Sequence, residues 1–150
     1  MRIFAGLDDL AGSEGTALGP TPWLDVDQHR IDAFADATDD RQWIHVDPQR
    51  AATGPYGSTI AHGLLTLSLL PRFMHELYRV DHVAMAINYG FDKIRFLAPV
   101  PVGSRLRASA VIFGVSAVDG GVQVRLVTTI ELAGSAKPAA VIESIVRYLG

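Results

Sequence analysis

Residues 60–78 read IAHGLLTLSLLPRFMHELY and contain the longest strongly apolar run of the chain. Leucine fills five of the seven positions from 64 to 70, so the stretch predicts a long helix that is apolar on nearly every side. A helix with that pattern is buried in a protein core. Ser58 or Thr59 is the expected N-cap, and Pro71 is expected to kink the helix or to start a second segment.

Alternating strand patterns fill the chain after this helix. They cover residues 84–100, 101–118, 122–134 and 137–150, and the DGG triplet at 119–121 is a hairpin signal. Strands that are joined by hairpins pair antiparallel, since a parallel pair needs a long crossover connection. A buried helix followed by such strands predicts an α+β fold in which a curved antiparallel sheet wraps around a long central helix.

The first half of the chain is expected to be less regular. Residues 27–38 show apolar residues at helical spacing, with Asp27 placed as the N-cap. Residues 38–59 then form a long polar connection, and long loops inside compact domains are usually functional or disordered. Trp43 and Tyr56 within this connection predict an ordered, partly buried loop.

Composition narrows the class of protein. With 150 residues, 49% of them apolar and 19% charged, the chain is expected to fold as one domain over residues 1–150. A net charge of −3 gives no general attraction to nucleic acid or to anionic membranes. The absence of cysteine excludes disulfides, thiolate zinc sites and cysteine nucleophiles. No apolar run has the length of a signal-peptide core or a membrane span, so a cytoplasmic location is expected.

Two short motifs carry a resemblance to a known family. Residues 40–45 read DRQWIH, and residues 60–63 read IAHG. They are similar to the Asp-x-Asn-Pro-(Leu/Ile)-His and Ile-(Ala/Val)-His-Gly motifs of the MaoC-like (R)-specific enoyl-CoA hydratases, and the resemblance covers about residues 22–148. Gln42 and Trp43 replace the Asn and Pro of that family, and neither is a group to which the resemblance assigns chemistry.

The resemblance implies a hot-dog fold, a homodimer joined edge to edge and a place in fatty acid metabolism. It also implies the reversible addition of water to a trans-2-enoyl-CoA to give a (3R)-hydroxyacyl-CoA. This hydro-lyase reaction needs no metal and no cofactor. Asp40 and His45 are the implied acid–base pair, and the backbone N–H of Gly63 is the implied donor to the thioester oxygen.

The residue types fit the demands of that reaction. Water must lose a proton, the α-carbon must gain one, and the negative charge that develops on the thioester oxygen must be stabilised. Asp40 and His45 are five residues apart, so a regular helix would hold them about 140° from each other. They converge only if the segment leaves the helix. Which of the two is the base and which the acid stays open.

Gly63 is expected in the first turn of the long helix, where backbone N–H groups lack partners within the helix. The missing side chain lets a carbonyl oxygen approach closely, and the helix dipole favours negative charge there. The two motifs together therefore predict one site, in which a loop with an acid and a base faces the amino end of a helix.

Each of these residues alone also fits a simpler interpretation. Asp40 alone would be a carboxylate that caps a turn, and His45 alone a buried, hydrogen-bonded imidazole. Only their joint occurrence with IAHG favours catalysis. His62 is expected to orient the loop or to pack at the helix start rather than to react. His45 and Asp47 have the spacing of a metal-binding pair but lack a third ligand, so no metal site is expected.

Other features of the function stay open from the sequence. The substrate partner is an acyl thioester of CoA or of acyl carrier protein, of unspecified chain length and pathway. Lys93, Arg95, Arg105 and Arg107 fit either a rim for CoA phosphates or the ordinary outer face of a sheet. Two rival functions are an acyl-CoA thioesterase, which would release free thiol, and a noncatalytic acyl-CoA-binding or assembly subunit, which would bind without turnover.

Overall fold

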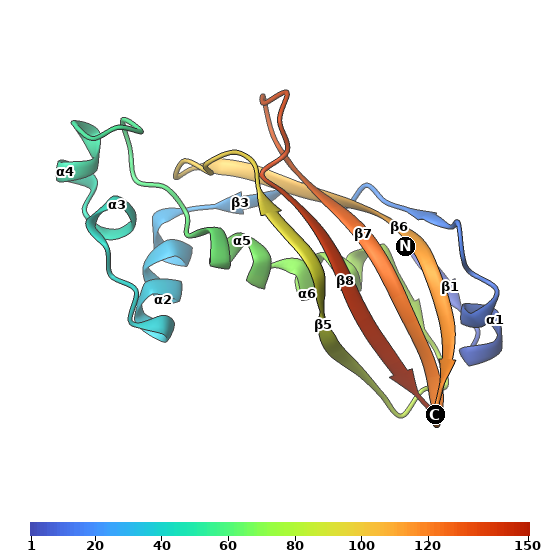
Figure 1. Ribbon diagram of the computed structural model, residues 1–150. Helices are drawn as coiled ribbons and strands as arrows, with labels where there is room; N and C mark the ends of the chain where they lie inside the picture. The colour runs from blue at the N-terminus through green and yellow to red at the C-terminus, as the bar shows by residue number, and fades with distance from the viewer.

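A strongly curved antiparallel sheet dominates the computed structural model, which describes residues 1–150 (Figure 1). Its long strands are β5 (Met85–Phe96), β6 (Ser104–Val118), β7 (Gly121–Leu132) and β8 (Ala140–Leu149). They run in the order β6-β7-β8-β5, and two short strands, β2 (Ala17–Leu18) and β3 (Leu24–Val26), pair with the other side of β6. All these pairs are antiparallel, as the sequence predicts.

The predicted DGG hairpin is confirmed between β6 and β7. Val118 pairs with Gly121 across the turn, and Gly120 has a φ of 70°. Only glycine adopts that left-handed conformation without steric cost, so the turn depends on this residue.

The central helix is shorter than predicted and consists of two segments, α5 (Gly63–Ser68) and α6 (Leu70–Leu77). The expected start at Ile60 is wrong, because Ile60 and Ala61 are extended and hydrogen-bond to the chain elsewhere: the Ile60 amide donates to the Ile44 carbonyl and the Ala61 amide to the Val100 carbonyl. The predicted cap at Ser58 or Thr59 is therefore also wrong, and His62 takes the N-cap position.

Pro71 starts the second helical segment, which is one of its two predicted roles. It lies in the first turn of α6, where its missing N–H costs no intrahelical hydrogen bond. Leu69 separates the two segments and still donates its amide to the Leu65 carbonyl. The break is therefore small, and α5 and α6 continue along the same face of the sheet (Figure 1).

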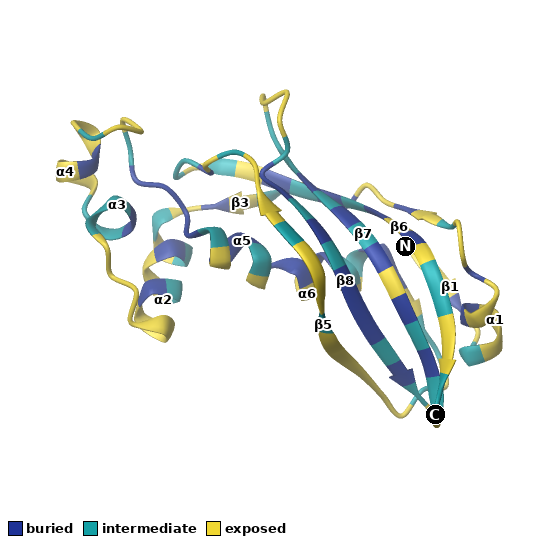
Figure 2. Ribbon diagram, in the orientation of Figure 1, coloured by how far each residue is buried: buried dark blue, intermediate teal, exposed yellow.

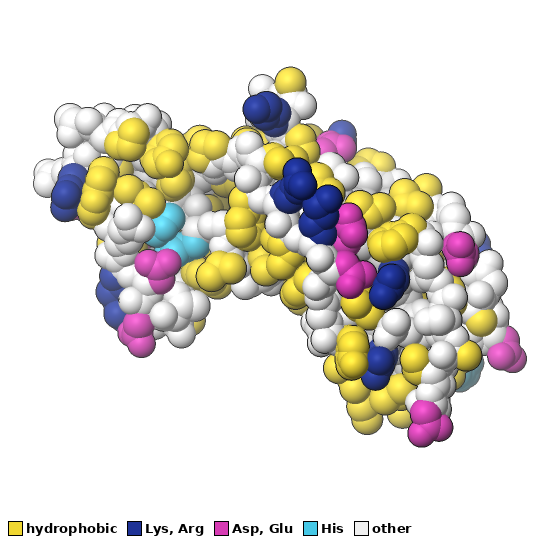
Figure 3. Space-filling model, viewed as in Figure 1, with side chains coloured by type: hydrophobic (Ala, Val, Ile, Leu, Met, Phe, Trp, Pro, Cys, Tyr) yellow, Lys and Arg dark blue, Asp and Glu magenta, His cyan; other side chains and the backbone are white.

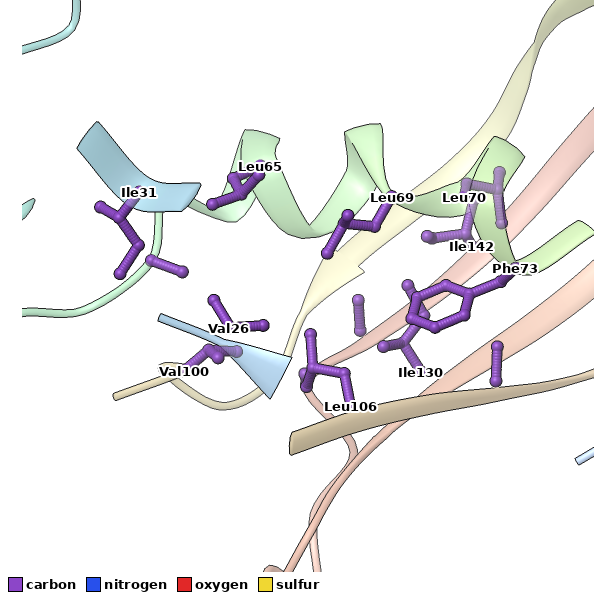
Figure 4. Close-up of a cluster of buried hydrophobic side chains, with 14 residues drawn as sticks. Val26, Ile31, Leu65, Leu69, Leu70, Phe73, Val100, Leu106, Ile130 and Ile142 are labelled. Atoms are coloured by element: carbon purple, nitrogen blue, oxygen red, sulfur yellow. The ribbon is translucent and has the colours of Figure 1, made fainter. Parts of the chain in front are cut away.

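The main core lies between this helix pair and the concave face of the sheet. Figure 4 shows Leu65, Leu69, Leu70 and Phe73 directed from α5 and α6 toward the sheet. The facing residues include Leu106, Ile130 and Ile142. Phe73 is fully buried, and burial of a side chain of this size stabilises the fold by about 2–3 kcal/mol.

The leucine pattern predicts a helix that is buried on nearly every side, and this prediction is wrong for one flank of α5. Leu64 is 58% exposed and Ser68 is exposed as well, so one flank of α5 faces outward (Figure 2). Edge strand β5 is also exposed along most of its length. The sheet covers the other flank of α5, but nothing in this single chain covers the flank that carries Leu64.

A lobe of three short helices extends beyond the end of the sheet (Figure 1). It consists of α2 (Gln28–Thr38), α3 (Trp43–Val46) and α4 (Pro48–Ala52), so the predicted loop over 38–59 contains two helices. The predicted cap of α2 is confirmed, since the Asp27 side chain accepts from the Arg30 amide. Ile31 of α2 belongs to the main core and anchors the lobe to it.

The amino terminus forms a short strand and a short helix. β1 (Arg2–Phe4) pairs in parallel with β4 (Tyr78–Val80), and α1 (Leu7–Ala11) follows β1. Phe4 and Leu10 pack with Leu77 in a second hydrophobic cluster. No helix in the structure combines the length and the hydropathy that crossing a membrane requires.

Candidate active site

A pocket of about 330 Å³ lies where the lobe meets the amino end of α5. Its walls include His45 from the lobe, Gly63 from α5 and Phe96 from β5, together with Tyr56. Figure 3 shows histidine side chains in the hollow between the lobe and the rest of the molecule, next to an acidic side chain. Both sequence motifs thus border one cavity.

The local chain path explains why Asp40 and His45 meet. Helix α2 ends at Thr38, and Asp39 adopts a left-handed conformation with a φ of 59° that turns the chain out of the helix. Asp40 lies after that turn, and His45 lies on the next helix, α3. Their ligand atoms and one ring nitrogen of His62 all lie within 4.8 Å of one another. Asp40 and His45 thus lie close together because the chain has left helix α2 before Asp40.

One hydrogen bond defines the tautomer of His45. Its Nδ1 lies 2.7 Å from the carbonyl oxygen of Ile60. Because a carbonyl oxygen only accepts, Nδ1 carries the proton, and Nε2 of the neutral ring keeps a free lone pair. His45 is buried, which lowers its pKa; the nearby His62 lowers it further, and the Ile60 hydrogen bond and Asp40 act in the opposite direction. The neutral form, which can accept a proton, is therefore favoured.

His62 holds the loop that carries Asp40, in the orienting role that the sequence suggests. Its Nε2 donates to the backbone carbonyl of Asp40 over 2.9 Å. The ring stacks on that of His45 with 3.8 Å between centroids and 24° between planes. Its Nδ1 is buried without a hydrogen-bond partner. His62 therefore connects the amino end of α5 with the turn that places Asp40.

Asp40, His45 and His62 are close enough to be considered as metal ligands. The lone pair of an imidazole lies in the plane of its ring, and zinc binds along it at about 2.0–2.1 Å. The rings of His45 and His62 lie in nearly parallel planes, 24° apart with 3.8 Å between centroids, so one ion cannot lie in both ring planes at zinc-binding distance from both. Asp47, the other acid considered, accepts from the Arg50 amide as the cap of α4.

Gly63 is the first residue of α5, where its N–H has no intrahelical acceptor. The ring of Phe96 lies directly beside it, because a Cβ built on Gly63 would be only 3.0 Å from Cδ2 of Phe96. Glycine is therefore required for the close packing of this ring against the helix end. Sequence reasoning missed Phe96 and Tyr56 as pocket walls, since nothing in strand alternation or in an exposed loop tyrosine indicates which cavity a side chain borders.

The four basic residues considered as a phosphate rim do not line this pocket. Arg105 and Arg107 alternate with buried residues of β6 and stack on Trp23, and Arg107 also pairs with Glu131. These contacts favour the interpretation of an ordinary outer sheet face.

A larger pocket of about 420 Å³ lies beside the far end of α6. Its wall contains Tyr78 and Tyr148, whose hydroxyls are hydrogen-bonded to each other. Burial raises the pKa of both tyrosines, so neither is a base near neutral pH. We place the candidate site at the smaller pocket, because its wall contains the neutral imidazole of His45, and the carboxylate of Asp40 lies within 4.8 Å of that ring.

Residues 9–133 match the family of the MaoC like domain. The chain belongs to this MaoC-like family. The 3-hydroxyacyl-thioester dehydratase Z of Mycobacterium tuberculosis (strain ATCC 25618 / H37Rv) is 55% identical to it over 150 residues, which cover 99% of each protein. Nodulation protein N of Rhizobium leguminosarum bv. viciae is 48% identical over 108 residues, covering 71% of this chain and 67% of that protein.

Solved structures of MaoC-like proteins share the fold. The monoamine oxidase regulatory protein from Archaeoglobus fulgius has a TM-score of 0.78 at 22% identity, and the match covers 99% of this chain and 97% of that one. The (R)-hydratase from A. caviae involved in PHA biosynthesis has a TM-score of 0.72 at 24% identity, with 89% and 94% covered. The hot-dog fold that the sequence predicts is confirmed.

Proposed function

We propose that this MaoC-like protein is a hydro-lyase that reversibly adds water to a trans-2-enoyl thioester and gives the (3R)-hydroxyacyl thioester. The family and the dehydratase relative with 99% coverage support hydratase or dehydratase activity. The observation that carries the residue assignment is the convergence of Asp40 and His45 beside the amino end of α5. The (3R) product and the assignment of catalytic roles to Asp40, His45 and Gly63 are part of the proposal.

In this proposal Asp40 and His45 hold the reacting water between them. The free lone pair of His45 Nε2 accepts a proton, and the Asp40 carboxylate accepts a hydrogen bond from the same water. The oxygen of the water attacks the β-carbon, and the electron pair of the double bond moves to the α-carbon and the thioester oxygen. The proton that leaves the water then returns from the Asp40–His45 pair to the α-carbon, so the enzyme ends each cycle unchanged.

The backbone N–H of Gly63 is the proposed donor to the thioester oxygen. Negative charge develops on that oxygen when the water attacks, and a fixed donor stabilises this charge more than it stabilises the neutral carbonyl. The first residue of α5 offers such a donor, and it borders the same pocket as His45. The acid–base pair and the donor then act on opposite ends of one conjugated thioester.

The substrate in this proposal is an acyl thioester of CoA or of acyl carrier protein. The relative from Mycobacterium tuberculosis bears the name of a 3-hydroxyacyl-thioester dehydratase, which fits either carrier. Eight of the twelve residues around the pocket are hydrophobic, which suits the acyl part of such a molecule.

We also propose that two copies form a homodimer through β5. The exposed edge of this strand has unpaired backbone groups, and such an edge is a template for another strand. Large hydrophobic side chains are exposed along the strand, namely those of Met85, Ile87, Tyr89, Phe91 and Phe96. Leu64 on the outward flank of α5 would be covered by the same association.

Hydration of crotonyl-CoA by Asp40→Asn and His45→Gln variants tests the proposed function. The conjugated thioester absorbs ultraviolet light and the product does not, so loss of absorbance gives the rate. Both variants should lose nearly all activity, whereas Asp36→Asn and His75→Gln, which change exposed residues outside the pocket, should keep it. Full activity in both site variants would reject the assignment.

The same samples separate the rival functions. A thioesterase would release free CoA thiol, which a thiol reagent detects, and a hydratase would not. A noncatalytic subunit would bind the thioester without converting it, even with Asp40 and His45 intact.

A further inference from the structure

The side chain of Gln28, at the start of α2, connects three segments around the site. Its Nε2 donates to the backbone carbonyl of His45 over 2.7 Å and to Oδ1 of Asp32 over 2.9 Å. Its Oε1 accepts from the hydroxyl of Thr59 over 2.6 Å. Gln28 does not itself border the site pocket, so it reaches the site only through these partners.

The amide of Gln28 fits these partners in only one orientation. A flipped amide would place Oε1 against two oxygens that only accept, the His45 carbonyl and the Asp32 carboxylate. Thr59 is 1% exposed, and its hydroxyl donates to Gln28 alone. Loss of the amide would therefore leave a buried hydroxyl without an acceptor, which proteins rarely tolerate.

These bonds close a ring around His45. Gln28 holds the His45 backbone carbonyl, and the His45 ring donates from Nδ1 to the carbonyl of Ile60. Thr59 directly precedes Ile60 and donates its hydroxyl hydrogen bond to Gln28. The backbone and the ring of one histidine are thus tied to the same two-residue segment from opposite sides, which restricts both the position of the residue and the rotation of its ring.

We propose that Gln28 is a positioning residue that fixes His45 in its Nδ1–H tautomer, with Nε2 directed into the pocket. This inference deepens the proposed function and rests on it for its kinetic part. Gln28 is hydrogen-bonded to no pocket wall other than His45, so it acts on the reacting geometry and not on substrate affinity. Misplacement of a catalytic group by about 1 Å lowers rates by up to roughly 100-fold.

Kinetics of a Gln28→Met variant test this inference. Methionine matches the length of glutamine but offers no hydrogen bond to His45 or Thr59. We expect kcat to fall by about 10- to 100-fold while KM changes by less than about twofold. Gln28→Glu should lose more, because its carboxylate would face two acceptor oxygens. Gln49→Met, an exposed glutamine of α4, is the matched control and should leave both constants unchanged.

Thr59 provides a second test that does not depend on the folding of the Gln28 variants. Thr59→Ser keeps the hydroxyl that donates to Gln28, and Thr59→Val removes it at nearly the same volume. We expect a fall in kcat for valine and near-normal kcat for serine. Equal kcat in the two Thr59 variants, or equal kcat in Gln28→Met and Gln49→Met, would overturn the inference.

Nitrogen NMR of the imidazole rings tests the positioning role of Gln28 without an activity measurement. In the wild-type protein, Nδ1 of His45 should give the signal of a protonated nitrogen, and in Gln28→Met both tautomers should be populated. If the wild-type protein hydrates no enoyl thioester but this change occurs, the proposed function fails and the positioning of His45 stands. An unchanged His45 spectrum in a folded Gln28→Met variant would refute the positioning role.

Discussion

Glycine at position 63 offers a backbone N–H, which alanine would keep, and leaves room for the ring of Phe96, which alanine would not. Replacement of Gly63 by alanine separates these two properties. A Cβ at this position would lie 3.0, 3.1 and 3.2 Å from three ring atoms of Phe96. These contacts are tighter than ordinary van der Waals contact, so the ring must give way by a few tenths of an ångström. Phe96 is 47% exposed and can make that movement without disturbing the core.

The expected effect of Gly63→Ala is therefore on catalysis and not on folding. Alanine is a better helix former than glycine by up to about 1 kcal/mol, which offsets the cost of moving an exposed ring. Phe96 borders the pocket, and a misplacement of about 1 Å costs up to roughly 100-fold in rate, so a smaller shift beside the reacting carbonyl should lower kcat several-fold. The melting temperature should stay within a few degrees of the wild-type value.

A double variant decides whether Phe96 transmits the effect. Gly63→Ala keeps its backbone N–H, and without the ring the added Cβ displaces nothing. The double variant Gly63→Ala/Phe96→Ala should therefore be nearly as active as Phe96→Ala alone. Hydration of crotonyl-CoA is the assay for all three variants, with thermal unfolding as the control for folding. Wild-type activity in Gly63→Ala, or a double variant as inactive as Gly63→Ala, would refute this reasoning.

Three further predictions concern pH, the core and the edge strand. Burial lowers the pKa of His45 below its ordinary value of about 6.5, so the unfolded chain binds this proton more readily than the folded chain. Acidification from pH 6.5 toward the folded-state pKa should therefore lower the free energy of unfolding. His45→Gln should reduce that loss, which urea unfolding at several pH values measures. Phe73→Ala should destabilise the fold by about 3–5 kcal/mol in the same unfolding assay, and a loss below about 1 kcal/mol would contradict the core described above. Ile87→Lys should convert the proposed dimer to monomer in size-exclusion chromatography with light scattering, and an unchanged mass would argue against association through β5.

The sequence predicts the sheet well because its signals are local. Alternation defines the long strands, and the turn at Gly120 requires only residues next to it. The start of the central helix is wrong for the opposite reason. Ile60 and Ala61 continue an apolar pattern, but their amides bind carbonyls of Ile44 and Val100, which lie 16 and 39 residues away. Long-range hydrogen bonds of this kind leave no mark in the local pattern.

Some features of the candidate site likewise have a local signal in the sequence, and others depend on distant residues. The convergence of Asp40 and His45 requires the chain to leave the helix before Asp40, and aspartate at position 39 is a residue type that favours such a turn. Gln28 gives no such signal, because its partners His45 and Thr59 are 17 and 31 residues distant. The exposed flank at Leu64 was also not predictable, since an apolar pattern indicates what must be covered but not whether the same chain covers it.

The face-to-face imidazoles of His45 and His62 have a consequence for the charge that the cavity tolerates. Their centroids lie 3.8 Å apart, and the nearby His62 is one of the causes that lower the pKa of His45. Protonation of His45 in acid would place a cation against the stacked ring and would remove the lone pair of Nε2. The ring of His62 also holds the carbonyl of Asp40, so a charge that pushed the two rings apart would loosen the turn that places Asp40.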